Sequence, residues 1–272
     1  MKKTPHPMLR YVRPGADTTA MCPGCGNGII AHSTLRAIDE LGLDMDRFVF
    51  VSGIGCSGWI PSPYFHADTL HTTHGRPVAF ATGVKLARPE LNVMVFSGDG
   101  DLSAIGGNHF IHAARRNIGI TVVCVNNGIY GMTGGQVAPT TPPDVRTVTT
   151  PYGNLERTFD LCALAEAAGA PYVARWTTYH ARPLTRSVKK ALGRRGFNFI
   201  EVITQCPVQF GRRAGTGNAV RMMEGYRKNT VTVQRARSMT EEERAGKWIV
   251  GEFVEREEPE LGERIRALWR RV

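Results

Sequence analysis

Apolar residues alternate between helical and strand-like spacing along the chain up to about residue 203. Within 27–41 they recur near helical spacing and Gly42 follows, which predicts a helix that ends at the glycine. Short apolar runs elsewhere predict buried strands. This pattern gives strands at 48–52, 92–97, 120–125, 171–175 and 197–203, with further helices at 77–86, 102–116, 160–168 and 182–194. The alternation predicts an α/β fold with a doubly wound, mostly parallel sheet.

The pattern changes after Cys206. Glycine and arginine are frequent to about Gly217, and charged, partly amphipathic segments continue to Val272. We therefore expect an α/β domain over residues 1–206 and a C-terminal extension over 207–272 that packs on this domain or on a partner. A chain of 272 residues is long enough for such a domain with a sizeable core.

The composition is typical of a soluble globular protein, with 42% hydrophobic and 21% charged residues. No segment approaches the roughly 18 uncharged apolar residues that a membrane span needs. The basic start, Met1–Pro7, is not followed by the apolar run of a secretory signal. These features favour a cytoplasmic protein without membrane contact.

The chain is basic, with 34 Lys and Arg residues against 24 Asp and Glu residues and a net charge of +10. Such a charge attracts acidic partners, for which nucleic acid and an acidic electron carrier are both candidates. The basic pairs, such as Arg115–Arg116 and Arg212–Arg213, are scattered and lack the interleaved aromatic residues of a single-strand-binding face. A solvated basic surface explains them, and nucleic acid is not the expected partner.

The apolar run 92–97 leads directly into Gly98–Asp99–Gly100. In open parallel sheets ligands bind beyond the carboxyl ends of the strands, where the next helix offers free N–H groups to anions. Glycines allow the backbone to approach a phosphate closely, and a carboxylate between them can bind a divalent cation. The alternative is a tight turn in which Asp101 caps the following helix.

Asn126–Asn127 follows the next strand of the same βαβ unit. The fold brings both strand ends to one edge of the sheet, beside Asp99. A carboxylate, an amide oxygen and a backbone carbonyl are suitable Mg²⁺ ligands together with two diphosphate oxygens. Gly-Asp-Gly followed about thirty residues later by Asn-Asn resembles the thiamine diphosphate motif. That resemblance implies that Asp99, the Asn127 side chain and the Ile129 carbonyl bind the metal.

Four of the six cysteines form a second set. Cys22 and Cys25 have C-x-x-C spacing, whereas Cys56 and Cys206 lie where the strands 48–52 and 197–203 should end. Four thiolates suit zinc or an iron–sulfur cluster, and two isolated cysteines spread over a fold favour the cluster. A thioredoxin-like redox pair is disfavoured because no good strand precedes Cys22. Cys124 and Cys162 are interpreted as core residues.

Gly53-x-Gly55-x-x-Gly58 also matches a dinucleotide-binding fingerprint after a strand. Such a turn opens directly into a helix, but Pro61 and Pro63 interrupt the segment here. No strand with an acidic end follows about twenty residues later. The NAD interpretation therefore fails on its context.

From Cys22 to about Gly215 the chain resembles the thiamine-binding β subunit of 2-oxoacid:ferredoxin oxidoreductases. The resemblance rests on Cys-Pro-Gly-Cys-Gly, Gly-Ile-Gly-Cys-Ser, His-Thr-Thr-His-Gly-Arg, Gly-Asp-Gly-Asp, the segment from Asn126 to Gln136, and the isolated Cys206. It implies that the four cysteines hold one [4Fe-4S] cluster. It further implies a cofactor-binding set made of Ile54, Gly55, Cys56, Ser57, His74, Gly98, Asp99, Gly100, Asp101, Asn127, Ile129, Gly131 and Met132. A buried structural histidine is the alternative for His74.

The resemblance implies coenzyme A-dependent oxidative decarboxylation of a 2-oxoacid to acyl-CoA and CO₂, with electrons passed through the cluster to ferredoxin. In that family the activating glutamate belongs to the α subunit, so no catalytic acid or base is expected here, and the expected assembly is αβ or (αβ)₂.

Trp59 stands where some relatives have a basic residue. The segment from Trp59 to Phe65 resembles versions specific for 2-oxoglutarate, with pyruvate and branched-chain 2-oxoacids as alternatives. A thiamine-dependent non-redox enzyme and a zinc-stapled, basic nucleic-acid-binding module are the rival interpretations.

Overall fold

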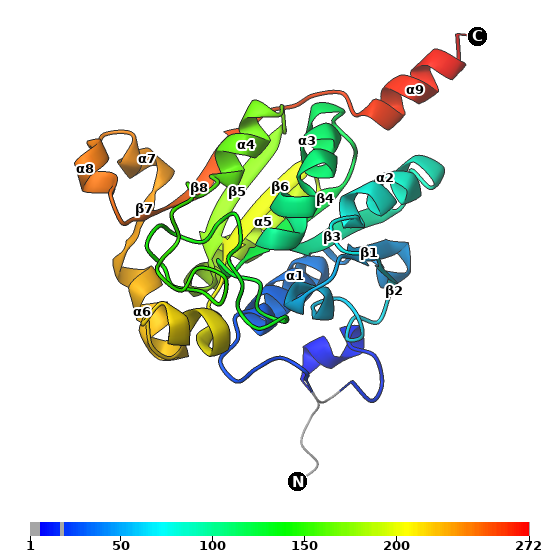
Figure 1. Ribbon diagram of the computed structural model, residues 1–272. Helices are drawn as coiled ribbons and strands as arrows, with labels where there is room; N and C mark the ends of the chain where they lie inside the picture. Colours follow the sequence, from blue (N-terminus) through cyan, green and yellow to red (C-terminus); the bar gives the residue numbers. More distant parts are fainter. Residues whose placement is uncertain (1–5, 17–18, 272) are drawn as a thin grey trace.

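The computed structural model describes residues 6–16 and 19–271, which form one twisted sheet with helices on both faces (Figure 1). The strands are β1 (Phe48–Ser52), β2 (Asp68–His71), β3 (Asn92–Gly98), β4 (Thr121–Asn126), β5 (Tyr172–Thr177), β6 (Asn198–Ile203), β7 (Thr230–Thr232) and β8 (Trp248–Glu255). The α-helices are α1 (Asn27–Leu41), α2 (Pro77–Ala87), α3 (Gly107–Arg115), α4 (Leu161–Ala167), α5 (Ala181–Leu192), α6 (Ala219–Lys228), α7 (Val233–Ala236), α8 (Glu241–Arg244) and α9 (Leu261–Trp269). Short 3₁₀ turns are η1 (Pro7–Tyr11), η2 (Met45–Arg47), η3 (Cys56–Trp59) and η5 (Thr178–His180), and π-helical turns are η4 (Asp101–Ile105) and η6 (Pro207–Gly211).

The strand order is β2-β1-β3-β4-β6-β5-β8-β7. All neighbouring strands are parallel except β5 and β8, which are antiparallel. The predicted βαβ unit is present, because β3 and β4 are adjacent, parallel and joined through α3. The prediction of a doubly wound, mostly parallel α/β sheet is therefore confirmed.

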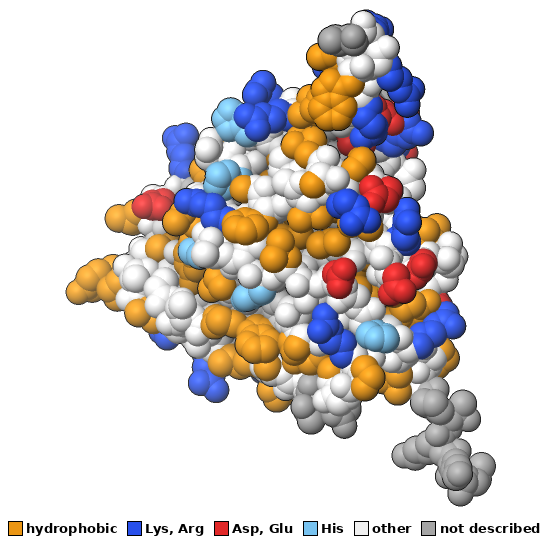
Figure 2. Space-filling view, turned by 90° about the vertical axis from the view of Figure 1, so that its right-hand side faces the viewer, with side chains coloured by type: hydrophobic (Ala, Val, Ile, Leu, Met, Phe, Trp, Pro, Cys, Tyr) orange, Lys and Arg blue, Asp and Glu red, His pale blue; other side chains and the backbone are white. Residues whose placement is uncertain are grey.

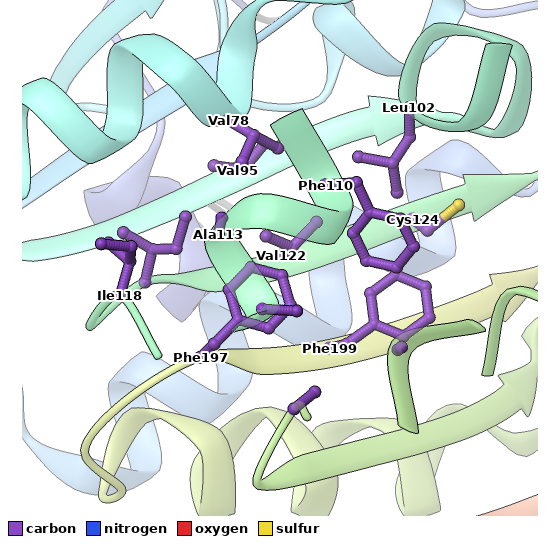
Figure 3. Packing of buried hydrophobic residues seen from close by; sticks show 14 of the residues in the cluster. Val78, Val95, Leu102, Phe110, Ala113, Ile118, Val122, Cys124, Phe197 and Phe199 are labelled. Atoms are coloured by element: carbon purple, nitrogen blue, oxygen red, sulfur yellow. The ribbon is translucent and has the colours of Figure 1, made fainter. Parts of the chain in front are cut away.

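Each face of the sheet has its own apolar core, because alternate side chains of a strand point to opposite faces. Helices α2, α3 and α4 cover one face, and α1 and α5 cover the other. Figure 3 shows the first core, where the ring of Phe110 from α3 lies 4.9 Å from that of Phe199 in β6, between centroids. The strands are nearly continuous apolar runs because both faces are buried.

Most of the predicted boundaries lie within two residues of the observed ones. Helix α1 ends where Gly42 adopts the left-handed conformation with φ 62°, a conformation that glycine adopts without a steric penalty. The segment after β1 forms only the short turn η3 and then the edge strand β2. The expectation that no helix follows the glycines at 53–58 is therefore confirmed.

Two parts of the fold before residue 206 differ from the expectation. The helix predicted over 102–116 consists of the π-helical turn η4 followed by α3. Gly106 joins them, and a Cβ there would lie 2.4 Å from the Asp101 carbonyl oxygen, so only a glycine fits this close approach. Strand β2 was not predicted. It is a four-residue, half-exposed edge strand and lacks a buried apolar run.

The segment 207–272 adds β7 and β8 to the same sheet, and α9 extends beyond the body of the molecule (Figure 1). The division of the chain at residue 206 stays a prediction. None of the helices in the described ranges 6–16 and 19–271 is both long and apolar enough to cross a membrane.

Candidate cofactor site

The carboxyl ends of β3 and β4 bring Asp99 beside the Asn126–Asn127 pair. Gly98 and Val125 are register partners in these parallel strands, so Asp99 and Asn127 each leave the sheet at the same edge. The predicted convergence of the two motifs is present. Asp99 is only 2% exposed, so its carboxylate faces the inside of the site rather than solvent.

Burial strongly disfavours the charged form of Asp99 and raises the pKa of its carboxyl from 3.8 to about 7. The hydroxyl of Thr140 donates a hydrogen bond of 2.5 Å to its Oδ2, which opposes this rise in pKa. Among the residues that the structure describes, Asp99 has no ion-pair partner. A buried carboxylate without a paired cation fits the binding of a divalent metal ion.

The loop after β4 contains two further oxygen atoms that the sequence predicted as metal ligands, Oδ1 of Asn127 and the carbonyl oxygen of Ile129. The Oδ1 atom of Asn127 accepts a hydrogen bond of 3.1 Å from the backbone N–H of Ile129, which folds the loop back on itself. The carbonyl of Gly128 accepts a bond of 2.6 Å from the Thr141 hydroxyl. The carbonyl of Ile129 carries no such bond within the described residues.

A cavity of about 220 Å³ lies at this edge of the sheet. All thirteen residues that the sequence assigned to cofactor binding line this cavity. They are Ile54, Gly55, Cys56, Ser57, His74, Gly98, Asp99, Gly100, Asp101, Asn127, Ile129, Gly131 and Met132. The structure thus brings the predicted set together, while the binding role of each residue stays a prediction.

Asp101 is buried and joins three segments of the cavity wall. Its Oδ1 accepts hydrogen bonds from the Gly75 N–H at 2.7 Å and the Ile54 N–H at 3.3 Å, and it lies 2.6 Å from Nδ1 of His74. Its Oδ2 accepts a bond of 2.5 Å from Ser97. Asp101 therefore does not act as the simple helix cap of the alternative interpretation. It orients the imidazole of His74, which is partly exposed to the cavity.

Two glycines leave room in the cavity wall. A Cβ on Gly100 would lie 2.4 Å from the ring of Tyr130, whose hydroxyl donates a bond of 3.1 Å to the Gly100 carbonyl. Gly55 has φ 131°, a conformation that L side chains rarely adopt. Both positions bring the backbone close to the space that a ligand would fill.

The four predicted cluster cysteines meet at a second cavity, of about 250 Å³. Its lining includes Cys22, Cys25, Cys56 and Cys206. A Cβ on Gly131 would lie 3.7 Å from Sγ of both Cys56 and Cys206, so these two sulfurs approach one point. Residues far apart in the chain are thus gathered as the sequence predicted.

Burial, and to a smaller extent the neighbouring cysteines, raise the pKa of the Cys25 and Cys56 thiols to about 11. Such thiols stay protonated at neutral pH unless a metal stabilises the thiolate. Cys124 and Cys162 are fully buried away from this cavity, Cys124 in β4 and Cys162 in α4. Their interpretation as core residues is confirmed.

The two cavities share a wall made of Cys56, Asn127, Gly131 and Met132. A group held by the thiols and a group held beside Asp99 would therefore be neighbours. Sequence reasoning missed Tyr130 and Thr140 as parts of the site. Thr140 comes from a long loop without periodicity, so nothing in the sequence linked it to Asp99.

Comparison with known proteins identifies the family. Residues 53–202 match the model described as "Thiamine pyrophosphate enzyme, C-terminal TPP binding domain", thiamine pyrophosphate being another name for thiamine diphosphate. The chain is 53% identical over 263 residues to 2-oxoglutarate synthase subunit KorB of Methanocaldococcus jannaschii, and this match covers 97% of each chain. It is 46% identical over 187 residues to 2-oxoacid:ferredoxin oxidoreductase subunit beta of Saccharolobus solfataricus, covering 68% of this chain and 61% of that one.

A solved structure of 2-oxoglutarate:ferredoxin oxidoreductase from Magnetococcus marinus matches with a TM-score of 0.86 and 32% identity. The match covers 100% of this chain and 91% of that one. The fold, the cavity beside Gly-Asp-Gly and these matches agree, and thiamine diphosphate is the ligand that the family model names. The chain therefore belongs to the thiamine pyrophosphate enzymes and, among them, to the beta subunits of the 2-oxoacid:ferredoxin oxidoreductases.

Proposed function

We propose that this chain, paired with an α subunit, catalyses the coenzyme A-dependent oxidative decarboxylation of 2-oxoglutarate and passes the electrons to ferredoxin. Relatives named 2-oxoglutarate synthase support the substrate, as does the solved relative that has 2-oxoglutarate, coenzyme A and succinyl-CoA bound. The observation that carries the redox part is the wall shared by the cofactor cavity and the four-thiol cavity.

For the cofactor, we assign Mg²⁺ to Asp99, Oδ1 of Asn127 and the Ile129 carbonyl. One charged and two neutral oxygen ligands leave positions for diphosphate oxygens and water, as Mg²⁺ prefers. The carboxylate of Asp99 is buried and has no ion-pair partner among the described residues, which supports this assignment. When bound, thiamine diphosphate supplies the carbanion chemistry that removes CO₂ from a 2-oxoacid.

We assign a [4Fe-4S] cluster to Cys22, Cys25, Cys56 and Cys206. Four thiols around one cavity fit such a cluster, whereas tetrahedral zinc sites usually come as two closely spaced pairs. The position of Cys56 in the wall of both cavities supports an electron-transfer role over a purely structural one. When bound, the cluster supplies a one-electron acceptor next to the thiamine site.

The need for an α subunit follows from the carboxylates that line the cofactor cavity. Among the described residues these are Asp99 and Asp101. Asp99 is assigned to the metal, and Asp101 already accepts bonds from three segments of the chain. Neither is free to activate the aminopyrimidine of the cofactor, so a carboxylate of the partner subunit must do so.

Exposed apolar residues on α2 and η4 offer a surface for that partner. Phe80 and Leu86 of α2 and Ile105 of η4 are 47%, 45% and 51% exposed. Ile105 lies in the same π-helical turn as Asp101, which lines the cavity. Figure 2 views the molecule from the side on which α2 lies and shows hydrophobic side chains spread across that face. Apolar side chains on such a face are typical of an interface.

This chain also has a basic surface that suits an acidic electron carrier. Arg146, Arg212 and Arg213 line an open cavity of about 430 Å³. Val208 and Gln209 belong to both this cavity and the four-thiol cavity, so the arginines lie close to the assigned cluster. Basic residues at that place favour docking of an acidic ferredoxin.

The test uses this chain co-expressed with its α subunit. We expect about four iron and four sulfide per chain, and reduction of ferredoxin that depends on coenzyme A and is faster with 2-oxoglutarate than with pyruvate or branched-chain 2-oxoacids. One zinc per chain would overturn the cluster assignment. A preference for another 2-oxoacid would overturn the substrate and leave the family intact.

A further inference from the structure

Glu201 lies at the centre of a buried polar network directly behind the loop that carries the assigned metal ligands. It is 1% exposed, in the middle of the apolar strand β6. Its Oε2 accepts a hydrogen bond of 2.6 Å from Nε of Arg175, which is 8% exposed. A second guanidinium nitrogen of Arg175 donates a bond of 2.5 Å to Asp160, the N-cap of α4.

The carboxylates of Asp160 and Glu201 and the Cys162 sulfur lie close enough together to suggest a cation site. The guanidinium of Arg175 already bonds to both carboxylates, and the Cys162 thiol lies 3.4 Å from Glu201 Oε2 as a donor. Arg175 thus supplies the positive charge that a metal would bring. The group is an ion-pair network and not a second metal site.

The other carboxylate oxygen of Glu201 connects this network to the metal-binding loop. Its Oε1 accepts a hydrogen bond of 2.7 Å from Nδ2 of Asn126. Oδ1 of Asn126 in turn accepts a bond of 3.0 Å from the backbone N–H of Gly128. Since a backbone N–H can only donate, this bond fixes which atom of the Asn126 amide is oxygen and which is nitrogen.

We propose that Glu201 and Asn126 are positioning residues that fix the loop of the metal ligands Asn127 and Ile129. Gly128 lies between these two ligands, so the bond to its N–H sets the direction in which both are presented. The inference rests on the proposed Mg²⁺ and thiamine diphosphate site. Outer-shell partners of metal ligands typically affect metal affinity by about 10- to 100-fold.

The direction of donation makes the pair testable, because each single isosteric change leaves a mismatch that the double change removes. In Glu201→Gln, the new amide must keep its oxygen toward Arg175, so its NH₂ group faces the NH₂ group of Asn126. In Asn126→Asp, two carboxylate oxygens face each other across the 2.7 Å contact. Each mismatch either moves the loop or leaves a buried group unsatisfied.

In the double variant, Glu201→Gln with Asn126→Asp, the pattern of donors and acceptors is complete again. The introduced glutamine would donate from its NH₂ group to one oxygen of the introduced aspartate and accept from Arg175 with its own oxygen. The second oxygen of that aspartate would accept the Gly128 N–H. The net charge of the network is unchanged, because one carboxylate is lost at position 201 and one is gained at position 126.

The experiment measures thiamine diphosphate binding by calorimetry at saturating Mg²⁺, with α/β complexes stripped of the cofactor. We expect each single variant to raise Kd about 10- to 100-fold, with absorbance of the cluster and assembly with the α subunit unchanged. The double variant should bind within about threefold of the wild type, which additive defects would not produce. At saturating cofactor, kcat and the KM for the 2-oxoacid should stay close to wild type in all three complexes.

Two results would overturn the proposal. Either both single variants bind the cofactor as tightly as the wild type, or the double variant raises Kd by the product of the two single-variant increases.

Asp99→Ala serves as the reference for the site itself. If it loses the cofactor while both single variants keep it, the positioning role fails and the proposed metal site stands. If it too keeps the cofactor, the metal site itself is wrong. Should Glu201→Gln fail to fold, Asn126→Asp with the Arg175–Glu201 pair intact still tests the contact.

Discussion

Replacing Asp99 by asparagine should stabilise the cofactor-free protein and, at the same time, prevent it from binding its cofactor. The asparagine has the same shape and can still accept the hydrogen bond from Thr140. It removes only the negative charge, which is buried without a paired cation among the described residues. The two opposite effects separate the binding role of Asp99 from its role in folding.

The magnitude follows from the pKa of this carboxyl, about 7 in the folded chain against 3.8 for an unperturbed aspartate. Because the folded-state pKa is the higher one, ionisation opposes folding. The cost begins near pH 4, grows as the pH rises and is complete above about pH 7. At 1.36 kcal/mol for each pH unit between the two values, it amounts to roughly 4 kcal/mol.

The assay compares thermal unfolding of cofactor-free α/β complexes at pH 8 and pH 6. The Asp99→Asn complex should have the higher Tm at pH 8, and the difference should shrink at pH 6. Mg²⁺ and thiamine diphosphate should raise the Tm of the wild type alone. We expect the variant to bind the cofactor more than about 100-fold more weakly, a greater loss than is typical when an outer-shell residue is replaced. Asp46→Asn, at an exposed position, is the matched control and should change neither property. Wild-type cofactor affinity in Asp99→Asn, or a lower Tm at pH 8, would refute the reasoning.

Three further predictions concern the cluster, the core and the wall of the cofactor cavity. Cys206→Ala should lose the broad absorbance at about 400 nm that is typical of iron–sulfur clusters, whereas Cys124→Ala, a core cysteine, should keep it; the reverse outcome would show that the ligand set is wrong. Phe110→Ala should lower the free energy of unfolding by about 3–5 kcal/mol, because it empties a fully buried position beside Phe199, and a loss below about 1 kcal/mol in chemical denaturation would contradict this packing. Gly100→Ala should weaken thiamine diphosphate binding, since the added Cβ would push the Tyr130 ring from its place, and unchanged affinity by calorimetry would count against that close approach.

The sequence predicted the part of the site that lies at strand ends. Gly98–Asp99–Gly100 and Asn127 each follow an apolar run, and parallel strands bring their carboxyl ends to one edge. The same reasoning placed Cys56 and Cys206 beside each other, because β1 and β6 also end there. These inferences needed only the order of elements and the direction of the strands.

The parts that the sequence did not predict depend on contacts between distant loops and on short elements. Thr140 reaches Asp99 from a loop whose residues follow no periodic pattern. Glu201 could have been noticed as a lone carboxylate inside the apolar strand Asn198–Ile203, but its partner Arg175 is set only by the pairing of β5 with β6. Strands β7 and β8 were missed because β7 is only three residues long and Gly251 and Glu252 interrupt β8, so neither has the continuous apolar run of the central strands.

We propose that this chain holds the thiamine and cluster sites but needs an α subunit for turnover. The most direct measurement is viologen reduction by the purified chain alone, supplied with thiamine diphosphate, Mg²⁺, coenzyme A and 2-oxoglutarate, beside the same assay on the co-expressed α/β complex. We expect turnover by the complex and none by the chain alone, because the two carboxylates that line the cofactor cavity among the described residues, Asp99 and Asp101, already have other roles. Comparable turnover by the chain alone would show that it carries its own activating carboxylate and would contradict the division of roles between the subunits.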